Sequence, residues 1–233
     1  PYELASRLSY FLWSSMPDEQ LFARAADSSL SRPEILRAEV ERMLNDPKSL
    51  AFVENFTGQW LHLRQLGEMP PDPEQNPSYY NDNLEDAMKT ETLLFFGDLL
   101  KRNGSLVSLI DADYTFLNGA LARHYGISGV EGDFQRVSLK PEHQRGGLLG
   151  HGSILTATSN GVETKPVVRG VWILENLLGT PPTSPPPDVE PIEPDVRGIH
   201  TIRELMTKHR ENPTCYECHR KICLLYTSDA ADD

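Results

Sequence analysis

Apolar residues recur at steps of three and four along the first 126 residues, and this spacing restricts the fold more than any other feature of the sequence. Leu4, Leu8, Phe11 and Leu12 follow it at the start of the chain, as one face of an amphipathic helix does. Later segments repeat it with Phe52, Phe56, Trp60 and Leu63, then with Leu84, Met88, Phe95, Phe96 and Leu99. We therefore predict a mainly α fold, in which residues 1–130 form a helical bundle domain.

Start and stop signals separate these periodic segments. Ser31-Arg32-Pro33-Glu34 has the pattern of a capping box and predicts a helix start. Asp46-Pro47 predicts the start of the helix that carries Trp60, and Asn103-Gly104 predicts the end of the long helix from Leu84.

Residues 131–222 have a different character, and we expect them to form a second small, mostly helical domain. One two-residue step near Val137 indicates a weak strand, and Val171–Leu178 reads as a helix that begins after Arg169-Gly170. Seven prolines lie between Pro181 and Pro194. Because proline lacks the backbone N–H, this stretch predicts an extended strap.

The charge balance argues against two classes of partner. The 233 residues include 22 Lys and Arg against 34 Asp and Glu, which gives a net charge of −12. Nucleic acid and anionic membrane surfaces repel such a chain, and no run of about 18 apolar residues predicts a membrane span. The chain begins at Pro1 without a leader sequence, so we expect a fragment whose partners include other domains of the same longer chain.

All three cysteines lie within nine residues, in and just after the motif Cys215-Tyr216-Glu217-Cys218-His219. In this spacing the thiols of Cys215 and Cys218 reach the two vinyl groups of one haem, and the imidazole of His219 ligates its iron. The motif predicts covalently attached haem c. The sixth iron ligand stays open, with upstream candidates His151, His200, Met206 and His209.

Other interpretations of the cluster remain. A structural zinc site could use Cys215, Cys218, His219 and Cys223, with His209 as a further donor. Adjacent residues such as Cys218 and His219 have difficulty occupying two corners of one tetrahedron, which weighs against zinc. A redox Cys-x-x-Cys normally lies at a helix start after a strand, whereas this motif follows a predicted helix and Asn212-Pro213. The remaining interpretation is that the spacing of this cluster arose by chance.

The rest of the sequence assigns no reaction, so whether the chain is an enzyme stays open. It has no nucleophile elbow, phosphate loop, dinucleotide fingerprint or zinc-protease motif. Asn160, Lys165 and Arg169 have the right chemistry to hold an anion such as a haem propionate, although an arginine in such a position more often caps a helix or forms an ion pair at the surface.

Several long motifs resemble a known family. Residues 3–13, ELASRLSYFLW, and residues 111–118, DADYTFLN, are similar to one domain of unknown function; Gly146-Gly147-Leu148-Leu149 and residues 172–182, WILENLLGTPP, are similar to its companion. The chain thus resembles planctomycete-type cytochrome-associated proteins with the paired domains of unknown function 1592 and 1588. The resemblance implies an extracytoplasmic, c-type haem-associated protein of the cell envelope, but it does not supply a reaction. With the haem motif, we expect an electron-transfer or redox role and a redox partner.

The resemblance ends at Ile222. Residues 223–233 resemble translated adapter sequence, so we expect a non-native tail that includes Cys223. The alternative function is a zinc-stabilised or metal-free interaction module of the cell envelope.

Overall fold

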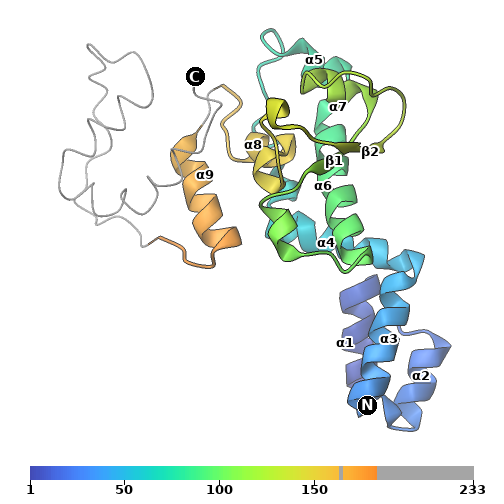
Figure 1. The fold of residues 1–233 in the computed structure, drawn as a ribbon. Helices are drawn as coiled ribbons and strands as arrows, with labels where there is room; N and C mark the ends of the chain where they lie inside the picture. The colour runs from blue at the N-terminus through green and yellow to red at the C-terminus, as the bar shows by residue number, and fades with distance from the viewer. Residues whose placement is uncertain (163–164, 183–233) are drawn as a thin grey trace, which may run out of the picture. The chain divides into compact units, whose positions relative to one another are not determined.

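The computed structural model describes residues 1–162 and 165–182. The chain divides into two compact units, Pro1–Ala157 and a second that begins at Thr158 (Figure 1). The fold is mainly α, as the sequence predicts. Most of the predicted proline strap and all of the cysteine motif lie outside the described residues.

Three helices form the N-terminal part of the first unit: α1 (Tyr2–Trp13), α2 (Glu19–Ala26) and α3 (Pro33–Asn45). The apolar repeat of the sequence places their buried side chains in one cluster: Ala5, Leu12, Trp13, Leu21, Ala25, Leu30 and Met43. The indole N–H of Trp13 donates a hydrogen bond to the Met43 carbonyl over 2.9 Å, which satisfies a buried donor that would otherwise destabilise the core.

A buried carboxylate connects α2 to α3. Glu39 accepts a hydrogen bond from Gln20 over 2.7 Å and one from Arg42 over 2.8 Å. Arg42 also donates to Asp18 over 2.8 Å, and Asp18 is the N-cap of α2. The charge of Glu39 is therefore paired where it is buried, which limits the cost of its desolvation.

Two of the predicted helix starts differ from the structure. Helix α3 begins at Pro33 with Arg32 as its N-cap and no side-chain cap, because a 3₁₀ turn over Ser29–Ser31 precedes it. Proline favours the first helical position, where its missing N–H needs no partner. After Asp46, a 3₁₀ turn (Pro47–Ser49) leads into α4 (Leu50–Trp60), and Leu63 begins a separate 3₁₀ turn (Leu63–Gln65).

Helix α6 (Leu84–Lys101) is the central element of the first unit (Figure 1). It contacts α4, β1 and three short helices: α5 (Pro77–Asn81), α7 (Gly119–His124) and α8 (Gly152–Ala157). Asn103 adopts a positive φ of 49° and the Gly104 N–H bonds to the Leu99 carbonyl over 2.8 Å. The predicted helix end is confirmed.

A two-stranded antiparallel sheet packs beside α6. Strand β1 (Tyr114–Leu117) pairs with β2 (Gln135–Ser138), and Tyr114 lies opposite Ser138. The weak strand predicted near Val137 is confirmed, whereas β1 was not predicted. The second apolar cluster forms here, from α5, α6, β1 and α7: Tyr79, Leu84, Ala87, Met88, Leu117, Leu121, Ala122 and Ile127.

The described part of the second unit contains α9 (Pro166–Trp172) and a π-helical turn (Ile173–Leu177). The predicted helix was Val171–Leu178, so its start was wrong by five residues. Pro166 supplies the helix start, and Arg169 and Gly170 lie inside the helix. In the part of the chain that the structure describes, no helix combines the length and the apolar character needed to cross a membrane.

Candidate functional site

The predicted haem site lies outside the described residues. This applies to Cys215, Cys218 and His219, and also to the further candidate ligands His200, Met206, His209 and Cys223. Within residues 1–162 and 165–182, no three His, Cys, Asp or Glu side chains come together as a metal site would require.

His151, the remaining candidate for the sixth iron ligand, is buried in the first unit. Its Nδ1 lies 2.9 Å from the Thr92 hydroxyl, which also lies 2.7 Å from the Ser153 hydroxyl. Phe95 packs edge-to-face on the imidazole, with ring centroids 5.0 Å apart. Burial lowers the pKa of His151 to about 3, so the imidazole is neutral. Its Nε2 is buried and has no hydrogen-bond partner among the residues that the structure describes.

A second buried group, Glu91, lies one residue before Thr92 on α6. Its two carboxylate oxygens each accept one hydrogen bond over 2.6 Å, from the hydroxyls of Thr115 and Tyr125. Burial raises the pKa of Glu91 to about 7, and the hydrogen bonds and the charge of Arg145 oppose that rise only in part. Both ionisation states of this carboxyl are therefore accessible near neutral pH.

Tyr125 connects this carboxylate to the chain beyond residue 145. Its hydroxyl accepts a hydrogen bond from the Gly152 N–H over 2.7 Å, and the Arg145 guanidinium lies 3.5 Å from the centroid of its ring. Arg145 also donates to the Gly150 carbonyl. We call Glu91, Thr92, Tyr125, Arg145 and His151 the α6 polar cluster. Its members bond to one another and to the backbone, which suits a structural role.

This cluster was not predicted, although the sequence holds a signal for it. The buried positions of α6 are Leu84, Ala87, Met88, Glu91, Thr92, Phe95 and Leu99. Glu91 and Thr92 thus occupy two positions of an otherwise apolar repeat. A carboxylate at such a position must find buried partners, because an unpaired buried charge is strongly destabilising.

The predicted anion-binding loop is only partly consistent with the structure. The Arg169 Nε donates to the Thr158 hydroxyl over 3.3 Å, and the side-chain oxygen of Asn160 accepts from the Val162 N–H over 3.2 Å. Arg169 is buried in α9, so the expectation that it lies at the surface was wrong. The propionate role of this loop stays a prediction.

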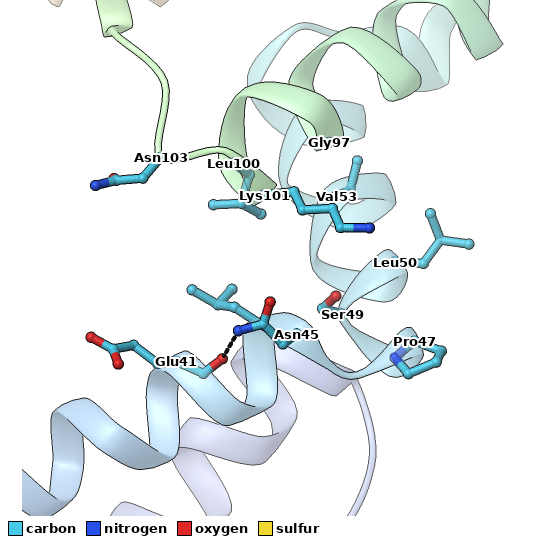
Figure 2. Close-up of a pocket in the computed structure, with 11 residues that line it drawn as sticks. Glu41, Asn45, Pro47, Ser49, Leu50, Val53, Gly97, Leu100, Lys101 and Asn103 are labelled. Atoms are coloured by element: carbon cyan, nitrogen blue, oxygen red, sulfur yellow. Dashed lines mark hydrogen bonds between the residues drawn. The ribbon is translucent and has the colours of Figure 1, made fainter.

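A groove of about 520 Å³ lies between the end of α3, the start of α4 and the end of α6 (Figure 2). Glu41 and Asn45 lie on its α3 side, and Gly97 and Lys101 lie on its α6 side. A Cβ at Gly97 would meet only Val53, at 3.8 Å. Packing therefore does not require glycine here, and the missing side chain leaves the groove open at this point.

Comparison with known protein families gives two matches. The model described as a protein of unknown function, DUF1592, matches residues 1–127. The chain belongs to the DUF1592 family. A second model, described as a protein of unknown function, DUF1588, matches residues 145–225. Both are cytochrome-c-associated families, and the predicted pairing is confirmed. No curated protein and no solved structure matches the chain.

The two matches do not coincide with the two structural units. The DUF1588 match begins at residue 145, inside the first unit, which extends to Ala157. Arg145, His151 and Gly152 therefore belong to the DUF1588 match while they bond to α6 and α7 of the DUF1592 match. The α6 polar cluster therefore connects the beginning of the DUF1588 match to residues within the DUF1592 match.

Proposed function

We propose that this chain is part of an extracytoplasmic c-type haem-associated protein, with Cys215 and Cys218 as the points of covalent attachment and His219 as an iron ligand. The observation that carries the proposal is the Cys-x-x-Cys-His motif, which lies inside the DUF1588 match. The cytochrome association of both families supports it.

The donor set fits a haem. Two thiols three positions apart, followed directly by an imidazole, supply two thioether attachments and one neutral nitrogen donor. When bound, a haem of this kind supplies one-electron transfer. The protein residues would hold the group covalently, so that attachment does not depend on a deep pocket.

Zinc is the competing ligand, and Cys223 distinguishes the two. The zinc site considered above uses Cys223 beside Cys215, Cys218 and His219, whereas haem attachment does not involve Cys223. Cys223→Ser is therefore a matched control for Cys215→Ser and Cys218→Ser.

The test is expression with a c-type maturation system, followed by acid–acetone extraction and pyridine-haemochrome analysis. We expect a Soret band that survives extraction in the parent protein and in Cys223→Ser, because thioether bonds resist it. Cys215→Ser with Cys218→Ser should lose covalent haem. A colourless protein that contains zinc, and releases it in Cys223→Ser, would show that the site is a metal clamp.

A further inference from the structure

The described part of the chain contains three Asn-Gly pairs: Asn103-Gly104, Asn118-Gly119 and Asn160-Gly161. In such a pair the backbone nitrogen of the glycine can attack the side-chain carbonyl carbon of the asparagine, because glycine has no side chain to obstruct the approach. The reacting pair is the same at all three places, so the local fold decides which of them reacts. Two conditions matter: a polarised asparagine carbonyl, and a glycine N–H that no other acceptor holds.

The Asn118 pair meets only the first condition. The side-chain oxygen of Asn118 accepts a hydrogen bond from the Leu121 N–H over 2.8 Å, because Asn118 is the N-cap of α7. The Gly119 N–H, however, donates to the Gly132 carbonyl over 3.0 Å. Gly119 is buried, and a Cβ at this position would lie 3.3 Å from the backbone of Glu131. The nucleophile is both bonded and enclosed, so this pair is protected.

The Asn103 pair meets neither condition. Asn103 follows the end of α6 and lies beside the groove that Figure 2 shows. The Gly104 N–H donates to the Leu99 carbonyl over 2.8 Å, and no donor of the described residues bonds to the Asn103 side chain. Attack would therefore require the helix end to open first, and a reaction that waits for local opening is slowed.

The Asn160 pair meets both conditions. The side-chain oxygen of Asn160 accepts from the Val162 N–H over 3.2 Å, so the side chain spans the Gly161 backbone and its carbonyl is polarised. Among the described residues, the Gly161 N–H makes one hydrogen-bond contact, 3.5 Å from the Ser159 hydroxyl. This distance exceeds the usual range of N–H···O bonds. Gly161 is also partly exposed, with a φ of 77°, so water reaches the pair.

We propose that Asn160 is a modification site, at which the chain converts its own asparagine to aspartate and isoaspartate. The Gly161 nitrogen loses its proton and attacks Asn160 Cγ. The Val162 N–H donates to the oxygen that becomes negative in this step, as the donors of an oxyanion hole do. The side-chain carbon–nitrogen bond then breaks, and its nitrogen takes up a proton and leaves as ammonia. Water opens either carbonyl of the resulting succinimide ring, so no oxidant or reductant is needed.

The modification would change the charge of the predicted anion-binding loop, which also includes Lys165 and Arg169. The amide at position 160 is neutral, whereas either product is a carboxylate, which repels the anions that Lys165 and Arg169 would attract. Isoaspartate also adds one methylene group to the main chain. The loop would therefore have two chemical states, and the time and pH that the protein has experienced would determine which is present. This inference does not depend on haem attachment.

The test is peptide mapping of the full chain by tandem mass spectrometry, folded in buffer and unfolded in guanidinium chloride, after incubation at pH 7 and at pH 9. In the unfolded chain all three pairs should convert at rates within about threefold of one another. In the folded chain Asn160 should keep its rate within about threefold, whereas Asn103 and Asn118 should slow at least about tenfold. The rate at Asn160 should rise with pH, because the Gly161 N–H must lose its proton.

Asn160→Gln is the matched variant, because glutamine keeps the amide but must close a larger ring. It should lose the earliest acidic species on isoelectric focusing, whereas Asn103→Gln should keep that species, and both should retain the far-ultraviolet circular dichroism of the parent. Conversion first at Asn103 or Asn118 in the folded chain would overturn the proposal, as would a tenfold slowing of Asn160 on folding. Aspartate without isoaspartate at position 160 would show direct hydrolysis by water and would overturn the attack by Gly161.

Discussion

Tyr125 donates a 2.6 Å hydrogen bond to the fully buried carboxylate of Glu91. The same tyrosine oxygen accepts from the Gly152 N–H. One hydroxyl therefore joins α6 to the first residue of α8.

Glu91 should make stability depend on pH. Its pKa in the folded protein, about 7, lies above its ordinary value of 4.5. The stabilisation that this group contributes is complete below pH 4.5 and is lost as the pH rises through 7. Relative to Glu91→Gln, which does not titrate, the free energy of unfolding should fall by about 3 kcal/mol over this range. Urea unfolding of both proteins at pH 4.5, 5.5, 6.5 and 7.5 measures the difference, and parallel pH profiles would contradict the assignment.

Tyr125→Phe should destabilise the first unit by about 1–3 kcal/mol, because it leaves the Gly152 N–H and one Glu91 oxygen without their partner. The aromatic ring under Arg145 is retained, so the loss reports the hydroxyl alone. Tyr2→Phe is the control, since Tyr2 is exposed, and it should change the urea midpoint negligibly. Equal midpoints for the two variants would show that the hydroxyl of Tyr125 contributes nothing.

Gly97→Ala and Gly152→Ala should have opposite effects. At Gly97 in the interior of α6, a methyl group meets only Val53, at 3.8 Å, and the helix gains about 0.5–1 kcal/mol from lower backbone entropy in the unfolded chain. At Gly152 a Cβ would lie 2.7 Å from the Tyr125 oxygen and 2.8 Å from Met88 Cγ, so overpacking should cost about 1–3 kcal/mol. Thermal unfolding of both variants tests the pair, and a destabilised Gly97→Ala would be inconsistent with the open groove.

His219→Ala should remove the imidazole ligand of a haem iron, or one ligand of a zinc ion, and leave the helical unit intact. The two apolar clusters and the α6 polar cluster all lie within residues 1–157. We expect a shifted Soret band, or loss of bound zinc, with little change in the far-ultraviolet circular dichroism. Unfolding of the whole chain in this variant would show that the motif stabilises the helices.

The helical bundle could be predicted because its information is local. The repeat that contains Leu12 and the end signal at Asn103-Gly104 each act over a few residues, and both are confirmed. Strand β1 escaped prediction because it has four residues, and its conformation depends on pairing with β2 some twenty residues later. The start of α9 was misplaced because Gly170 resembles a helix boundary, while Pro166 was the effective start signal.

The candidate site also has one part that the sequence predicts and one part that it does not. The Cys-x-x-Cys-His motif is contiguous, so its chemistry can be proposed from residues 215–219 alone. The α6 polar cluster joins residues separated by up to 59 positions, as Thr92 and His151 are. No local pattern encodes that contact, although the acidic residue on the apolar face of α6 indicates that a partner exists.

The bond between Tyr125 and Gly152 also decides where this protein can be divided for expression. A piece cut at residue 127, where the first family match ends, would keep Glu91, Thr92 and Tyr125 but lose Arg145, His151 and Gly152. Helix α6 of that piece would then expose polar and apolar side chains that are buried in the whole first unit. Exposed apolar surface of this kind promotes aggregation. A piece that ends after Ala157 retains Arg145, His151 and Gly152, and it is the shortest one we expect to be purified in folded form.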